Sequence, residues 1–188
     1  GPNNNTGVIY DADRLQYTGS ASTEFASEDM VLFLAMRIGQ VGGQYIWNQG
    51  GSGTRIRTLE NSGTFALNVI GFGGVTNTSG ASGNCTTTYD SKISTQTNLL
   101  AFRTNSSANT LAVYLDGGSA NVSTTAPSSV GRFFPNGQAV KVLDTTAAEA
   151  PFILYDMIVF NSSLRDANMD TVYNYLSLKY GIPVTDVS

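Results

Sequence analysis

Two groups of aromatic and amide residues in the chain have the chemistry of a binding site. Tyr45, Trp47 and Asn48 lie within one short stretch, and a glycine-rich turn follows them. Glycan sites combine an aromatic ring, which stacks on sugar C–H groups, with amides and carboxylates that bond the hydroxyls. In the competing interpretation Trp47 is a core residue between two sheets. Period-two alternation places Tyr45 and Trp47 on one face and Ile46 on the other, and it leaves open which of the two faces points inward. Phe133–Asn136 (Phe-Phe-Pro-Asn) is a further candidate, although at least one of its phenylalanines is expected in the core.

The stretch from Gly71 to Asp90 is rich in glycine, serine and threonine, and we expect it to be the longest irregular segment of the chain. Long loops in compact domains often carry function. Its polar and aromatic residues Asn77, Asn84, Tyr89 and Asp90 provide an alternative ligand-binding site at the rim of the fold.

Four aspartates are candidate calcium ligands, because calcium prefers carboxylate and carbonyl oxygens. They are Asp11, Asp13, Asp90 and Asp116. Their spacing matches no diagnostic calcium loop, so the competing interpretation is that each is solvated or stabilises a turn. Calcium is the one cofactor that the sequence suggests.

The chain lacks the residues of several common enzyme mechanisms. It contains no histidine, which excludes the usual serine and cysteine triads and histidine-based metal centres. Its four glutamates, Glu24, Glu28, Glu60 and Glu149, form no paired pattern of the kind that glycosidases on a β-sandwich use. Cys85 is the single cysteine, and no cation near it in sequence would activate it. We therefore predict a protein that is not an enzyme, with an unrecognised glycosidase as the alternative.

Length and charge limit the class of protein further. The chain has 188 residues and a net charge of −4, with 10 scattered lysines and arginines. We expect one domain over residues 1–188, no nucleic-acid partner and no membrane insertion, because neither a basic run nor an apolar span of about 20 residues occurs. The opening Gly1-Pro2 is typical of a protease scar, and residues 1–6 are expected to form a flexible entry.

Short apolar or alternating runs separated by turn residues predict an all-β fold. The clearest buried strand is Met30–Ile38, and further strands are expected over residues 8–10, 15–17, 44–48, 54–59, 64–70, 98–103, 110–115, 130–134, 140–143 and 151–160. The pattern changes near the end of the chain. Met169, Val172, Tyr173, Leu176 and Tyr180 follow helical spacing and predict a helix over about 164–180, which Gly181 ends.

Two stretches carry a family resemblance. The stretch Phe152–Ile182 resembles the closing strand and helix of bacterial and phage laminin-G-like, concanavalin A-like domains, in which Tyr-Leu-x-x-Lys-Tyr-Gly ends the helix. The stretch Asn98–Gly118 is similar to the hairpin of that family that ends in Leu-Asp-Gly. The resemblance implies a two-sheet antiparallel jelly-roll sandwich with one C-terminal helix. The chain departs from the family at the helix start, where Arg165 and Asn168 replace the residues of a capping box.

The resemblance and the missing catalytic groups predict a recognition or adhesion domain of a virion or cell-surface protein, with an extracellular location. A glycan or another cell-surface ligand is the expected partner. The alternative is a structural module, such as a capsid decoration, a tail-fibre domain or an adhesin spacer, which contacts other proteins. An exposed aromatic cluster would favour the first function, and a broad apolar patch the second.

Overall fold

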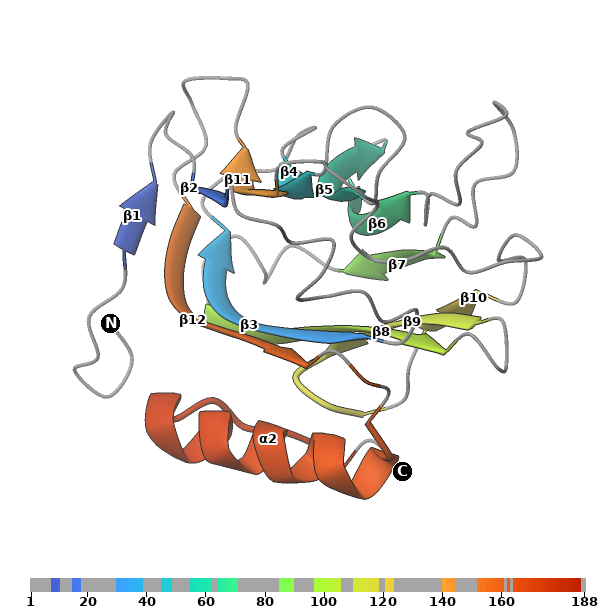
Figure 1. Cartoon of the computed structure of the whole chain (residues 1–188), viewed down its shortest axis with the longest axis vertical. Coiled ribbons are helices and arrows are strands. Elements are labelled where there is room, and N and C mark those ends of the chain that lie inside the picture. The colour runs from blue at the N-terminus through green and yellow to red at the C-terminus, as the bar shows by residue number, and fades with distance from the viewer. Residues whose placement is uncertain are drawn as a thin grey trace.

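In the part of the chain that it describes, a computed structural model shows two antiparallel β-sheets of six strands each and one α-helix (Figure 1). The structure describes residues 8–10, 15–17, 30–38, 45–48, 55–61, 64–70, 85–89, 97–105, 110–118, 121–123, 140–144, 152–160, 162 and 164–186. The helix-side sheet has the strand order β1 (Val8–Tyr10), β12 (Phe152–Phe160), β3 (Val31–Ile38), β8 (Thr97–Asn105), β9 (Thr110–Leu115) and β10 (Asn121–Ser123). The second sheet has the order β2 (Leu15–Tyr17), β11 (Val140–Asp144), β4 (Tyr45–Asn48), β5 (Arg55–Asn61), β6 (Thr64–Ile70) and β7 (Cys85–Tyr89).

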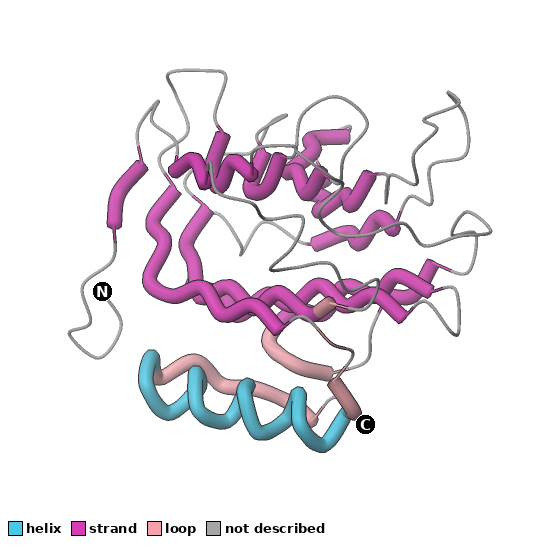
Figure 2. The backbone as a smooth tube through the Cα atoms, viewed as in Figure 1, coloured by secondary structure: helices cyan, strands magenta, loops and turns pink. Residues whose placement is uncertain are grey.

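The elements are arranged in three layers. Helix α2 (Asp166–Tyr180) covers one face of the helix-side sheet, and the second sheet lies on the other side of that sheet (Figure 2). The two sheets approach one another where β7 lies against β9 and β10. The mostly β architecture with one short helix, which the sequence predicts, is confirmed.

Strand β3 is buried on both faces, which explains its uninterrupted apolar sequence. Every residue from Met30 to Met36 is at most 1% exposed. Val31, Phe33 and Ala35 belong to the core beneath the helix, and the alternating residues between them point to the opposite face, toward the second sheet. The strand therefore joins two cores, one against α2 and one between the sheets.

Helix α2 presents the predicted apolar stripe to the sheet. Met169, Tyr173, Leu176 and Tyr180 are buried, and the ring of Tyr173 meets that of Phe33 edge to face with 5.3 Å between centroids. The helix ends at Gly181, which adopts the left-handed conformation with φ 67° and donates its N–H to the Ser177 carbonyl. Within the described residues, no helix is both long and apolar enough to span a bilayer.

The start of the helix lacks a side-chain cap, as the departure from the family pattern predicts. Arg165 occupies the N-cap position and makes no capping hydrogen bond. Asp166 in the first turn forms an ion pair with Arg103 of β8, and Arg103 Nη1 also lies 3.4 Å from Met169 Sδ. A carboxylate in the first turn is favourable to the helix dipole. The ion pair thus connects the uncapped end of the helix to the sheet.

Two strands were not predicted from the sequence. Strand β7 lies inside the stretch Gly71–Asp90 that was expected to be wholly irregular, so that expectation is wrong for residues 85–89. Strand β10 lies within a run of serine and threonine. Both are edge strands of polar sequence, and their pairing depends on a neighbouring strand, not on an apolar pattern of their own. The predicted strand at residues 130–134 lies outside the described residues.

Candidate binding site

The first predicted ligand site lies on an interior strand of the second sheet. Strand β4 pairs with β11 on one side and β5 on the other, and Trp47 is opposite Val142 and Ile56. The register against β5 shifts by one residue between Tyr45 and Trp47, as in a β-bulge. Because a bulge interrupts strict alternation, the placement of both rings on one face stays a prediction.

The second predicted site is separated from the first by intervening strands. Tyr89 ends β7, which is an edge strand, and β5 and β6 lie between it and β4. At the usual spacing of strands, β4 and β7 are roughly 14 Å apart. The structure therefore does not bring Trp47 and Tyr89 together, and they remain alternative sites. Asn77, Asn84, Asp90 and Phe133–Asn136 lie outside the described residues.

The four candidate calcium ligands follow strands β1, β7 and β9, and of these strands β7 and β9 contact one another. Asp11 and Asp13 come after β1, at one edge of the helix-side sheet, and lie outside the described residues, as does Asp90. Strands β12, β3 and β8 separate β1 from β9, which precedes Asp116. No cluster of three or more potential metal-binding side chains occurs in the part of the chain that the structure describes. A calcium site stays a prediction.

Asp116 organises the turn after β9. Its Oδ1 accepts a hydrogen bond of 2.7 Å from the Leu99 N–H, and its Oδ2 accepts one of 3.1 Å from Asn98 Nδ2. Its own N–H donates to the Leu99 carbonyl at 2.7 Å, and its φ is 49°, a value that aspartate tolerates better than most residues. The observed contacts of Asp116 are those of a residue that holds a turn together.

Burial gives this carboxyl a pH-dependent effect on stability. Removal from water raises the pKa of Asp116, although the hydrogen bonds from Leu99 and Asn98 lower it in part. The folded protein then retains the Asp116 proton to higher pH than the unfolded chain does. The stabilisation from Asp116 is complete below the pKa of the unfolded state and is lost as the pH rises through the pKa of the folded state.

We expect the variant Asp116→Asn to lose the part of the pH dependence of stability that comes from this carboxyl. Its amide would donate to Asn98 Oδ1, a buried atom for which the structure shows no hydrogen-bond partner, once the Asn98 amide turns over. The measurement is the free energy of unfolding in urea for both proteins between about pH 3 and pH 7. The stability of the wild type relative to the variant should fall as pH rises. A difference that is constant across this range would contradict the prediction.

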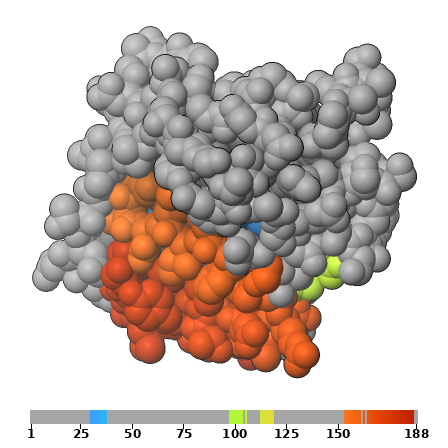
Figure 3. Space-filling model, viewed as in Figure 1, coloured from blue at the N-terminus to red at the C-terminus, as the bar shows by residue number. Residues whose placement is uncertain are grey.

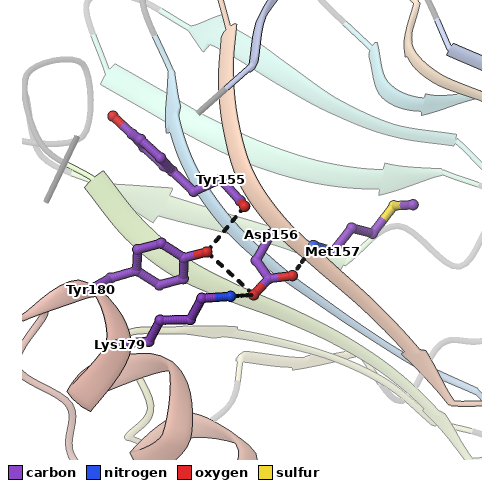
Figure 4. A network of polar contacts seen from close by, with 5 residues as sticks. All are labelled: Tyr155, Asp156, Met157, Lys179 and Tyr180. Carbon is purple, nitrogen blue, oxygen red and sulfur yellow. Dashed lines mark hydrogen bonds and ion pairs between the residues drawn. The ribbon is translucent and has the colours of Figure 1, made fainter. Parts of the chain in front are cut away.

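A polar network that the sequence did not reveal fastens the last turn of the helix to β12 (Figure 4). Asp156 Oδ2 accepts hydrogen bonds from Lys179 Nζ at 2.9 Å and from the Tyr180 hydroxyl at 3.3 Å, and Oδ1 accepts one from the Met157 N–H at 3.0 Å. The Tyr180 hydroxyl also lies 3.0 Å from the Tyr155 carbonyl oxygen. Four contacts thus hold the Asp156 carboxylate and the two helix side chains in one arrangement.

The network coincides with an irregularity in β12. The register against β3 shifts between Leu154 and Asp156, so that Tyr155 is the extra residue. A bulge bends its strand and redirects the side chains next to it. The ring of Tyr155 lies 5.8 Å from that of Tyr180, measured between centroids. The apolar run from Phe152 to Phe160, which Asp156 interrupts, was the only sign of this feature in the sequence.

Comparison with known proteins gives a match in structure but none in sequence. No protein-family model matches the chain, and the search of curated proteins finds no similar sequence. The chain is similar in structure to the binding domain of botulinum neurotoxin serotype D/C, with a TM-score of 0.66 at 12% identity over 90% of the chain. It is also similar to the DC binding domain in complex with rat synaptotagmin II, with a TM-score of 0.61, 12% identity and 92% of the chain covered.

A third similar structure is that of botulinum neurotoxin type C, whose cell entry is described as dependent upon interaction with two ganglioside molecules. Its TM-score is 0.62 at 11% identity over 92% of the chain. The chain spans only 43%, 48% and 47% of these three solved chains, in the order given. At such identities the likeness establishes a shared β-sandwich fold. It does not single out laminin-G-like domains.

Proposed function

We propose that the chain is a non-catalytic recognition domain, a two-sheet jelly roll of the laminin-G-like kind, that binds a glycan at the surface of a cell or virion. The observation that carries this proposal is the likeness of about nine-tenths of the chain to solved binding domains. One of these binding domains is in complex with rat synaptotagmin II, and the cell entry of the similar type C neurotoxin is described as dependent on interaction with two ganglioside molecules.

The chain's own residues support a glycan as the ligand. The sequence offers tyrosine and tryptophan rings beside amides in Tyr45–Asn48 and in the segment that ends at Asp90, which is the combination that sugars require. The neurotoxin chains are about twice as long as this one. Their ligands therefore suggest a class of partner, and the contact residues are proposed from this sequence alone.

The test is a glycan-array screen of the purified protein, with calcium and again with a chelator. Binding should fall by roughly tenfold or more in Trp47→Ala or in Tyr89→Ala, because either ring would lose its stacking surface. Trp47→Phe and Tyr89→Phe are matched controls that retain a ring. Urea unfolding of each variant separates lost binding from lost folding.

The other outcomes of the screen are equally informative. Loss of binding with the chelator alone would identify a calcium site among the predicted aspartates. A wild-type protein that binds nothing across neutral and acidic glycans would overturn the proposal and favour the structural module that contacts other proteins.

A further inference from the structure

The outer face of helix α2 carries large apolar side chains that are exposed to solvent. Leu178 is 83% exposed and Tyr175 is 53% exposed, whereas the aromatic residues Tyr173 and Tyr180 on the inner face are buried. The C-terminal part of the chain, orange to red in Figure 3, forms the lower surface of the molecule in that view. Tyr175 is thus an aromatic ring presented on an accessible surface.

The exposed ring lies next to an oriented ion pair. Lys179 Nζ is 5.7 Å from the centroid of the Tyr175 ring and 2.9 Å from Asp156 Oδ2. The same nitrogen lies 5.2 Å from the ring of Tyr180, whose hydroxyl also reaches Asp156. The charged side chains remain partly exposed, by 36% for Lys179 and 23% for Asp156. A ligand on Tyr175 would therefore reach both a donor and an acceptor.

This combination matches the chemistry of a sugar ring. The C–H face of a pyranose stacks on an aromatic side chain, and two neighbouring hydroxyls can accept from an ammonium and donate to a carboxylate. The side chains are already held in place, because Asp156 is bonded to Met157 N–H and Tyr180 as well as to Lys179. Little conformational freedom would be lost when a ligand binds.

We propose that Tyr175, Lys179 and Asp156 form a second glycan subsite, which takes a neutral pyranose with two adjacent hydroxyls. This inference rests on the proposed glycan-binding function. Asp156 compensates the charge of Lys179 at 2.9 Å, so the subsite offers hydrogen bonds without a net positive charge. A neutral sugar is therefore favoured over a sialylated one.

The subsite is separate from the sites predicted on β4 and β7. Helix α2 lies outside the helix-side sheet, whereas β4 and β7 belong to the second sheet on the far side (Figure 1). Two sites on opposite faces of one domain would allow it to engage two glycan branches or two neighbouring glycans. Such an arrangement strengthens attachment to a surface without any increase in the affinity of either site.

The experiment is saturation-transfer NMR and calorimetry on the whole protein, with lactose, maltose and cellobiose as neutral probes and sialyllactose as the acidic one. We expect Tyr175→Ala to weaken binding of a neutral probe by roughly tenfold and Tyr175→Phe to retain it, because stacking needs only the ring. Asp156→Asn should also weaken binding, since it replaces one acceptor oxygen of the carboxylate by an NH2 group, which can only donate. Leu178→Ala, on the same helix face, is the matched control and should bind as the wild type does.

The same set of proteins separates failure of this inference from failure of the proposed function. If the wild type binds and only Trp47→Ala or Tyr89→Ala reduces binding, the domain binds glycans and the subsite on α2 is wrong. If no probe and no array glycan binds, the proposed function fails and the inference fails with it. Tighter binding of sialyllactose than of the neutral probes would overturn the inference that the ligand is a neutral sugar. Self-association of the wild type that both Tyr175→Ala and Leu178→Ala abolish would instead make this face a contact between copies of the chain.

Discussion

Replacement of Gly117 by alanine is expected to destabilise the fold by about 2–4 kcal/mol. Gly117 has a φ of 73°, and a Cβ placed on it would lie 1.8 Å from the main-chain oxygen of Thr185. The two residues are joined by a parallel β-bridge, in which Thr185 N–H donates to the Asp116 carbonyl and Gly118 N–H donates to the Thr185 carbonyl. Alanine would have to displace a segment of backbone. Urea unfolding of the variant measures the loss.

Gly118→Ala is the matched control for that substitution. Its φ of 74° gives a similar backbone strain, but its Cβ would meet the Thr185 Oγ1 at 2.9 Å, which is the end of a side chain that can rotate. The additional change Thr185→Ala should therefore recover part of the stability lost in Gly118→Ala and none of that lost in Gly117→Ala. Equal recovery in both backgrounds would show that the close approach to the main chain is not the cause.

The bridge at Gly117 fixes the segment that follows the helix against the turn after β9. Beyond Gly181, Ile182 returns to the core at 7% exposure, and its carbonyl accepts a hydrogen bond of 2.6 Å from Ser177 Oγ. Thr185 then reaches the turn after β9. The last helical turn is thus tied to β12 through Asp156 on one side and to the β9 turn through Thr185 on the other.

Most elements with an apolar pattern could be predicted from the sequence, because burial on one or two faces leaves a local signature. The run Met30–Ile38 and the helical stripe ending at Tyr180 are both reproduced, with β3 at residues 31–38 and α2 at 166–180. Strands β7 and β10 have no apolar pattern of their own, since each is an edge strand that owes its structure to pairing with the strand before it, β6 and β9 respectively. The residues of such a strand do not by themselves indicate that pairing.

The candidate sites were less predictable than the fold. For Asp116 the sequence leaves two roles open, a calcium ligand and a turn residue. Only the structure shows that Leu99 N–H and Asn98 Nδ2 donate hydrogen bonds to its carboxylate. Asp156 is a single charged residue in an apolar strand, and no neighbouring residue in the sequence indicates a site there. Its partners Lys179 and Tyr180 are more than 20 residues away and reach it only after α2 packs across the sheet. A site that depends on such a tertiary contact, like the one proposed at Tyr175, cannot be predicted from residue spacing alone.

Phe33 packs between helix α2 and the helix-side sheet. It is fully buried at the centre of β3, and its ring meets those of Tyr173 and Phe160 edge to face, with centroids 5.3 and 6.1 Å away. Phe33→Ala should cost about 3–5 kcal/mol in free energy of unfolding, because the cavity would open between two elements that cannot both collapse into it.

Two further variants test the cause of that loss. Phe33→Leu fills most of the volume but loses the edge-to-face contacts, and it should cost about 1–2 kcal/mol. Leu178→Ala removes an apolar side chain of the same helix from solvent and should change stability by less than about 0.5 kcal/mol. A loss in Phe33→Ala no larger than that in Leu178→Ala would mean that α2 does not depend on β3 for its packing. The two-sided burial of this strand would then have to be rejected, and with it the packing that brings Lys179 of the helix to Asp156 of β12.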